Sequence, residues 1–470
     1  MISLESELVG STIRQIRPRG STFSDALFAF ANADYESTLQ LLSDFDSIEA
    51  TLLRARSFIR LSLFKRAVGE FETLKLENLG SAVGAEALTL LSLAHIGLRE
   101  IDFIGEHLAT ARTLACSSGS VVHEAEVEFT AAFYHFMNGE IDCATNALYR
   151  LLNLVSVCSP WKIIERTTQT LDEFRARAYD LLGHIAARDS RFIEQANFIY
   201  LAFAELDKVA ECDPYIASKL LGNLAVIGAD RDVAGVYEYV RDRIATLKFP
   251  GACQIFEFEI RRNLGRSASM HGDHIGALRE FRRSSEIAPN RASKIKALLD
   301  RSSLADELNE FVFANEESHF ALELTRQVDW SKVSAGETIA LLAMSQNLAD
   351  RNPVEARRLL DRFGECKRRH NAVHSVTTDL GYAGLECQAD ALISRAEGNV
   401  NRAKQLNLDA FDFFKRVDYI GRAAVVAVEI FELTGEHSYL EYAAAYSEKL
   451  PQSHLARRVN AHLNASTLTA

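Results

Sequence analysis

Few residues of this chain are spaced in a way that could support chemistry. The sequence contains no GxxxxGK(S/T) phosphate loop, no GxGxxG fingerprint, no GxSxG nucleophile elbow and no HExxH zinc motif. The segment Gly80–Gly84 (GSAVG) has the glycines of the elbow, but Ala82 stands where a nucleophilic serine would be needed. Neighbouring carboxylates such as Glu257 and Glu259 occur in any acidic helical protein and do not by themselves indicate an acid–base pair. We therefore predict a protein without catalytic residues that is not an enzyme.

Two histidine pairs have spacings that are worth testing as metal ligands. His370 and His374 are four residues apart and would share one face of a helix. The basic run Lys367–Arg369 precedes them and would repel a cation, so a solvated basic turn is the better interpretation. His271 and His274 flank a polar turn, where exposed histidines are common. We predict no metal site and no cofactor.

Arg262 and Arg266 are the strongest candidates for ligand binding. They are four residues apart, so they lie on one face of a helix. A guanidinium group binds a carboxylate or a phosphate through two parallel hydrogen bonds, and two such groups would suit an acidic ligand. The alternative is that both arginines form surface ion pairs with Glu257 or Glu259. Other basic doublets, such as Arg282–Arg283, are expected on solvated outer faces.

An aromatic run is the second candidate binding feature. Phe129, Phe133 and Phe136 recur at helical spacing. Packing in the core is the first interpretation of such a run, and an apolar groove for a partner helix is the alternative.

The composition indicates a long, soluble, helical chain. Its 470 residues are 48% hydrophobic and 25% charged, and they include only 7 Pro and 24 Gly, which favours helices. The formal net charge of -12 would repel phosphate backbones, so we predict no direct binding of nucleic acid. The 7 Cys include no CxxC pair and indicate reduced thiols. The N-terminal residues lack the apolar block of a signal peptide, and apolar windows such as Leu88–Leu98 are short for a membrane span. A cytoplasmic protein without a membrane segment is expected.

One pattern recurs along the chain: an amphipathic helix, a polar turn, and a second helix with small residues on one face. The clearest copy has Gly265 in its first helix, Gly272 at its turn, and Ala277 and Phe281 in its second helix. A small residue at Gly265 allows close helix crossing, and Pro289 ends the second helix. Weaker copies repeat the same spacings, at Ala55, Ala67 and Phe71; at Ala132, Ala144 and Leu148 with Gly139 at the turn; and at Ala391, Ala403 and Asn407 with Gly398 at the turn.

These positions resemble the tetratricopeptide repeat, although Arg261 stands where that family often has a bulky aromatic residue. The resemblance implies an all-α, right-handed α-α superhelix of about ten or eleven helical hairpins. It also implies a concave groove of the kind that receives extended peptides in that family. We expect an N-terminal arm over 1–20, a solenoid over 21–463 with candidate kinks near 160 and 250, and a frayed tail over 464–470.

Two functions agree with these observations. The first is a scaffold that binds a peptide, a protein segment or a small effector in its groove, with an acidic partner as the favoured case. The alternative is the sensory arm of a bacterial transcription regulator of the maltose-regulator, LuxR-type class, which the repeat over Ala389–Tyr419 resembles. In that case the DNA-binding domain would lie outside this chain. No feature of the sequence predicts an oligomeric state.

Overall fold

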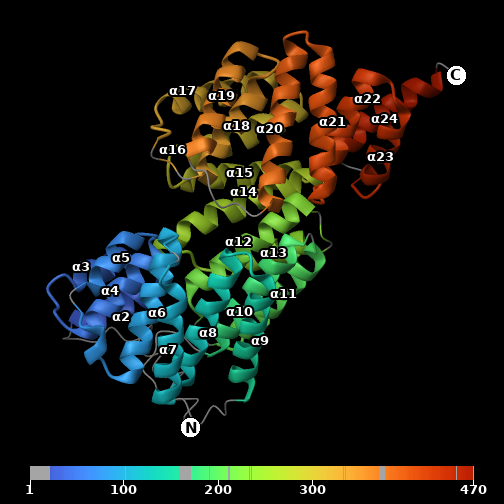
Figure 1. Ribbon diagram of the computed structural model, residues 1–470. Helices are drawn as coiled ribbons and strands as arrows, with labels where there is room; N and C mark the ends of the chain where they lie inside the picture. Colours follow the sequence, from blue (N-terminus) through green and yellow to red (C-terminus); the bar gives the residue numbers. More distant parts are fainter. Residues whose placement is uncertain are drawn as a thin grey trace. The chain divides into compact units, whose positions relative to one another are not determined.

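The structure is a computed structural model. It describes residues 22–468 apart from 158–170, 370–375 and the positions 73, 77, 101, 190, 210, 211, 232, 234, 332, 334, 451 and 452. These described residues form 23 α-helices and no strand (Figure 1). The prediction of an all-α solenoid is confirmed.

The helices follow one another as eleven hairpins and a final single helix. In order along the chain, the first six hairpins are α2 (Thr22–Ala31) with α3 (Tyr35–Leu41), α4 (Ile48–Arg60) with α5 (Phe64–Phe71), α6 (Ser81–Leu98) with α7 (Ile104–Ser118), α8 (Val121–Met137) with α9 (Ile141–Val157), α10 (Leu171–Arg188) with α11 (Phe192–Leu206), and α12 (Pro214–Arg231) with α13 (Val236–Ile244). The remaining elements are α14 (Gln254–Met270) with α15 (His274–Ile287), α16 (Arg291–Glu307) with α17 (Phe311–Arg326), α18 (Ala335–Leu348) with α19 (Pro353–Arg369), α20 (Val376–Ala396) with α21 (Val400–Arg416), α22 (Ile420–Thr434) with α23 (His437–Ser447), and α24 (His454–Leu468). Two short 3-10 helices, η1 (Leu76–Asn78) and η3 (Gly251–Cys253), lie between hairpins.

The chain divides into two compact units. Unit 1 comprises 1–187, 193–220 and 247–254, and unit 2 comprises 188–192, 221–246 and 255–470. Within each unit the first helices of successive hairpins pack side by side, as α4, α6 and α8 do in unit 1 and α16, α18 and α20 do in unit 2. The first helices therefore form one layer of each unit, with the second helices behind them.

Small residues set the distance between the two helices of a hairpin. A Cβ atom added at Gly265 of α14 would lie 2.6 Å from the Phe281 ring of α15. A Cβ added at Gly384 of α20 would lie 2.7 Å from the Phe414 ring of α21. Ala277 faces this contact in the first of these hairpins and is fully buried. Each aromatic ring thus rests directly on the backbone of the opposite helix.

The turns use the glycines that the sequence pattern singled out. Gly139, Gly272 and Gly398 follow the first helices of their hairpins with φ values of 80°, 79° and 80°, a region that favours glycine. The residue after Gly272 caps the next helix, because the Asp273 side chain accepts a hydrogen bond from the Gly276 N–H. Pro289 lies in the turn between α15 and α16.

Two further residues of the repeat pattern, Ala144 of α9 and Ala403 of α21, are fully buried in their hairpins. Both stand five residues after a turn glycine, at the position that Ala277 occupies after Gly272. A methyl group is therefore the largest side chain that these three contacts accommodate without rearrangement.

Helix α6 is long and apolar enough to cross a membrane, with a mean hydropathy of 1.4 over 18 residues. However, 56% of that segment is buried inside unit 1, where it packs against α5, α7 and α8. The central position of α6 in the helical stack accounts for its apolar composition.

The ends and the expected kinks lie partly outside the described residues. The arm predicted over 1–20 and the kink near 160 fall in segments that the structure does not describe. The candidate kink near 250 lies where the chain returns to unit 1 over 247–254 before it enters unit 2. Helix α24 continues to Leu468, so the segment 464–468, where a frayed tail was expected, is helical.

Ala277→Leu should destabilise unit 2. The added atoms would enter the contact among Ala268, Phe281 and Leu304, where overpacking costs roughly 1–3 kcal/mol. Ala109→Leu, at an exposed position of α7, is the matched control and should change little. Urea denaturation followed by circular dichroism measures both. Equal midpoints for Ala277→Leu and the parent protein would show that Ala277 does not limit this helix contact.

Candidate functional site

A cavity of about 400 Å³ lies within unit 1, on the side of the first helices. Its lining comes from α2, α4, α6, α8, α10 and the first turns of α12. Phe129, Phe133 and Phe136 of α8 form an aromatic wall of this unit 1 cavity. The same rings also pack against the core between α8, α9 and α10. The first interpretation of the aromatic run, packing in the core, therefore holds, and the same residues also line the cavity. The groove for a partner helix stays a prediction.

Arg56 of α4 organises one end of the cavity. Its Nε and Nη2 atoms donate to Glu86 of α6 at 3.0 Å and 2.9 Å, and its Nη1 and Nη2 atoms donate to Glu126 of α8 at 2.6 Å and 2.9 Å. Only 16% of the Arg56 side chain and 3% of the Glu126 side chain are exposed. Glu126 is a bidentate partner through both of its oxygens, whereas Glu86 accepts both of its hydrogen bonds on one oxygen. Contacts from α4 to α6 and α8 thus fix the orientation of this guanidinium.

The ion pairs of this network change the pKa of Glu86. Burial alone would raise that pKa, but Arg56 and His123 lower it to about 2. Glu86 is therefore ionised in the folded protein at any physiological pH.

Arg60 lies one turn after Arg56 and also faces the cavity. Its Nη2 atom is 3.3 Å from a carboxylate oxygen of Asp213, and its guanidinium lies 4.7 Å from the centre of the Tyr215 ring. The backbone N–H of Asp213 in turn donates to Glu173 at 2.7 Å. This chain of contacts joins α4 to α10 and to the start of α12, which are far apart in the sequence.

Arg177 of α10 completes the basic part of the lining. Its guanidinium lies 4.0 Å from the centre of the Phe129 ring, a cation–π contact. Burial, together with the positive charges of Arg60 and Arg56, lowers the pKa of Arg177 to about 10. Burial is the largest cause of this shift; the charge of Arg60 adds to it, and the charge of Glu126 opposes it.

The opposite rim carries Asp180, Lys219 and His184. Lys219 Nζ donates to Asp180 at 2.9 Å, and His184 Nε2 lies 3.6 Å from the same carboxylate. Burial lowers the pKa of His184, which favours its neutral form. The lining as a whole contains four cationic side chains and two carboxylates.

The structure separates the two arginines that the sequence singled out together. Arg262 is an ion-pair residue: its Nε atom lies 2.5 Å from Asp300 of α16 and its Nη1 atom lies 3.6 Å from Glu259. Glu257 pairs instead with Arg261, at 2.8 Å. Arg266 lines a second cavity, of about 360 Å³, that lies entirely within unit 2.

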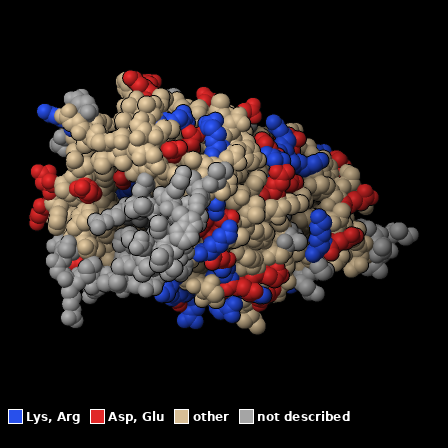
Figure 2. All heavy atoms as spheres, turned by 90° about the horizontal axis from the view of Figure 1, so that it is seen from below, with Lys and Arg blue, Asp and Glu red and all other residues tan. Residues whose placement is uncertain are grey.

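Charges of both signs are interspersed over the face of the molecule in Figure 2. Basic doublets of the sequence form ion pairs with nearby glutamates. Arg282 and Arg283 lie 3.3 Å and 3.6 Å from Glu286, and Arg357 lies 2.9 Å from Glu397. As expected for solvated doublets, 78% of the Arg282 side chain is exposed.

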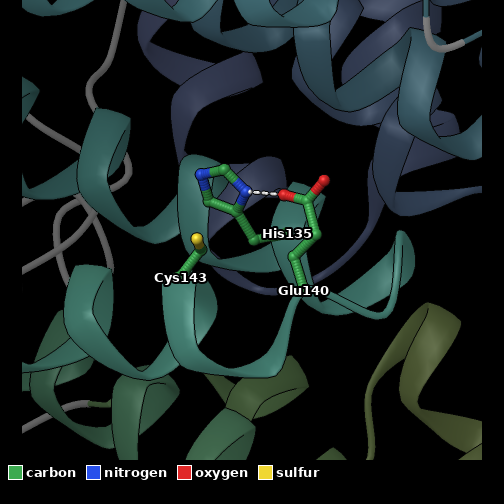
Figure 3. Close-up of side chains that lie close together, drawn as sticks. All are labelled: His135, Glu140 and Cys143. Atoms are coloured by element: carbon green, nitrogen blue, oxygen red, sulfur yellow. Dashed lines mark hydrogen bonds and ion pairs between the residues drawn. The ribbon is translucent and has the colours of Figure 1, made fainter.

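His135, Glu140 and Cys143 place one ligand atom each within 4.8 Å of one another (Figure 3). His135 Nδ1 is hydrogen-bonded to Glu140 at 2.5 Å, and the Cys143 sulfur lies beside the imidazole ring. The preceding hairpin shows the same arrangement, with His95 and Glu100 joined at 2.9 Å.

In that preceding hairpin Phe103 occupies the position of Cys143, three residues after the glutamate. The histidine–glutamate pair is therefore a feature of how these hairpins turn, and it needs no metal to explain it. The other histidine pair that the sequence raised, His370 and His374, lies outside the described residues.

Sequence reasoning missed the arginines of the unit 1 cavity, although a usable signal was present. Arg56 and Arg60 are four residues apart on the first helix of a hairpin, which is the relation that singled out Arg262 and Arg266. Arg177 gave no such signal, because its aromatic partner Phe129 lies on another hairpin.

Comparison with known proteins gives only distant likenesses. No protein-family model matches the chain, and no curated relative matches it. Among solved structures, a Rap protein complexed with competence and sporulation factor has a TM-score of 0.46 at 12% identity, over 88% of this chain and 98% of that chain. The apo form of RapI has a TM-score of 0.43 at 15% identity, over 88% and 98% of the two chains. Yeast Tom70 has a TM-score of 0.37 at 13% identity, over 93% and 98%. Likenesses at these scores say nothing about what this chain binds.

Glu86→Gln should destabilise unit 1 in a pH-dependent way. The pKa of Glu86 is about 2 in the folded protein against 4.5 for a free glutamate, so its ionised form stabilises the fold above pH 4.5. That contribution, roughly 3 kcal/mol at most from 1.36 kcal/mol per pKa unit, is lost as the pH falls from 4.5 towards 2. Thermal melts of both proteins across this range measure the narrowing difference.

Glu124→Gln on α8 is a control for which we expect the opposite pH dependence of stability. Burial and the charge of Glu128 raise the pKa of Glu124, so its protonated form is the stabilising one and this stability is lost as the pH rises. The variant should therefore gain stability relative to the parent as the pH rises. A Glu86→Gln difference that stays constant between pH 4.5 and 2 would contradict the role of the Arg56 network.

Proposed function

We propose that this chain is a non-enzymatic binding scaffold whose unit 1 cavity receives a short segment of a partner protein. The observation that carries the proposal is the composition of one cavity: three phenylalanine rings share its lining with arginines, of which Arg56 is buried and fixed by two carboxylates and Arg177 stacks on Phe129. Such a surface suits a segment in which an apolar side chain stands close to a carboxylate.

The apolar part of the recognition would come from α8. Phe129, Phe133 and Phe136 are held by the core on one side, so they need little further ordering when a ligand side chain covers them. A cavity of about 400 Å³ holds a few side chains and not a folded domain. The partner would therefore insert a short stretch of chain into it.

The acidic part of the recognition would come from the charge of the lining. Arg56 and Arg60 are held by Glu86, Glu126 and Asp213, and their positive potential extends to Arg177. A ligand carboxylate beside Arg177 would offset that potential through a charge-assisted hydrogen bond. This extends to unit 1 the acidic preference that the sequence indicated for Arg262 and Arg266.

The regulatory-arm function remains the alternative. The same cavity would serve either function. The two functions differ in one respect: a transcription regulator requires a DNA-binding domain, which the gene would encode downstream of Ala470. A reading frame that continues into a helix-turn-helix domain would identify the cavity as the regulator's input site.

Selection from a random peptide library displayed on phage tests the proposal directly. Selected peptides should be enriched in sequences that combine Asp or Glu with an aromatic or aliphatic residue. Calorimetric titration of those peptides should show at least tenfold weaker binding to Phe133→Ala and to Arg177→Gln. That loss corresponds to one charge-assisted contact or one apolar anchor of about 1.5–3 kcal/mol.

Phe311→Ala is the matched control, because Phe311 is an exposed phenylalanine of α17 in unit 2. It should bind the selected peptides as the parent protein does. Thermal melts establish that each variant is folded. If the peptides bind Phe133→Ala and Arg177→Gln with unchanged affinity, the unit 1 cavity is not their binding site.

A further inference from the structure

The unit 2 cavity lies where the beginning and the end of that unit meet. It is lined by α14 and α16 on one side and by α22, α23 and α24 on the other. Met270, the last residue of α14, packs against the core cluster that α22, α23 and α24 share. Residues separated by more than 150 positions in the sequence therefore surround one space of about 360 Å³.

Three arginines reach this cavity from three different helices. They are Arg266 of α14, Arg422 of α22 and Arg458 of α24. Arg458 is held in place by Glu432, to which its Nε and Nη2 atoms donate at 2.9 Å and 2.7 Å. Such a lining is unlike the alternating ion pairs of the outer surface, because the cations converge on a common space.

Two carboxylates, Asp300 and Glu307, also line the cavity. Asp300 is engaged by Arg262, which lies outside the cavity lining, at 2.5 Å. Glu307 accepts a hydrogen bond from the Ser269 hydroxyl at 3.2 Å, and burial raises its pKa towards the protonated form. The lining thus combines three arginines with one carboxylate that is shared with Arg262 and one whose protonated form burial favours.

His454 is a further titratable side chain of this lining. It lines the same cavity at the start of α24. Burial lowers its pKa, and the positive charges of Arg457 and Arg458 lower it further. Burial is the largest cause of this shift, so the neutral form of His454 is favoured and this side chain adds little charge to the lining.

We propose that the unit 2 cavity binds a small polyanion, with carboxylate or phosphate groups, that bridges Arg266 on α14 to Arg422 and Arg458 on α22 and α24. A bridge across helices requires at least two anionic oxygens, and each guanidinium can receive one carboxylate or phosphate group through paired hydrogen bonds. Tyr446 and Leu450, which also line the cavity, supply an apolar wall for the body of an organic anion.

The bound anion would have a structural consequence. It would fasten the first hairpin of this part of unit 2 to its last one, because its contacts join α14 to α22 and α24. Ligands that bind only the folded state stabilise it in proportion to their concentration. The site is distinct from the unit 1 cavity and does not depend on what that cavity receives.

Binding of citrate and of inorganic phosphate to the full chain tests this inference, with sodium chloride at matched ionic strength as the blank. Calorimetry should show saturable binding of one anion per chain. Preference for citrate or for phosphate distinguishes a carboxylate ligand from a phosphate ligand. Hydrogen exchange on the parent protein should slow on anion binding in both α14 and α22, since the anion contacts both helices.

Arg266→Gln and Arg422→Gln should each weaken anion binding at least tenfold, and Arg422→Lys should restore part of it. Arg282→Gln, on the exposed face of α15, is the matched control and should bind as the parent does. Arg177→Gln should also bind as the parent does, which keeps this test separate from that of the unit 1 cavity. Absence of saturable binding by either anion, or unchanged affinity in both cavity variants, would overturn the proposal.

Discussion

The contact between a glycine of one helix and an aromatic ring of its neighbour sets the geometry on which the rest of the structure depends. Gly265 with Phe281 and Gly384 with Phe414 bring the backbones of paired helices so close that a single added Cβ would lie within 2.7 Å of the ring. Such contacts leave little freedom in how the two helices of a hairpin cross. Because the first helices then stack on one another, the direction of every side chain on their free face follows from this spacing.

The buried charges of unit 1 are best understood as a consequence of that stacking. Taking Arg56 and Glu126 out of water carries a desolvation cost that can exceed what an isolated ion pair returns, so the pair is weak evidence that the network exists for stability. Its geometry suggests a positioning role instead. Two carboxylates on different helices fix one guanidinium, and that guanidinium and Arg60 raise the potential at Arg177. A ligand that meets this surface finds its partners already oriented.

The periodicity of the sequence was enough to predict the helical hairpins, but it was not enough to predict the candidate binding sites. The twelve-residue interval from Gly265 to Ala277 depends only on the helical repeat and the length of a turn, so the packing of that hairpin could be predicted from it. The partner of Arg262 could not, since Asp300 lies 38 residues away on the next hairpin. Arg60 and Asp213 are 153 residues apart. Contacts at such separations depend on the angle between each hairpin and the next. That angle results from many small packing contacts between hairpins, which no local sequence pattern encodes.

Cationic side chains outnumber carboxylates in the lining of both cavities, in a chain whose net charge is -12, and this contrast bears on how a ligand would be recognised. At physiological ionic strength charges are screened over about 8 Å, so the acidic outer surface scarcely affects a group that has already entered a cavity. The same surface gives an acidic ligand no long-range attraction on its approach. Selectivity would therefore reside in short-range contacts with fixed guanidinium groups and aromatic rings. Binding of this kind depends more on the rate of dissociation than on the rate of encounter, and the buried ion pairs that orient the arginines make it less sensitive to salt than binding at an exposed basic patch would be.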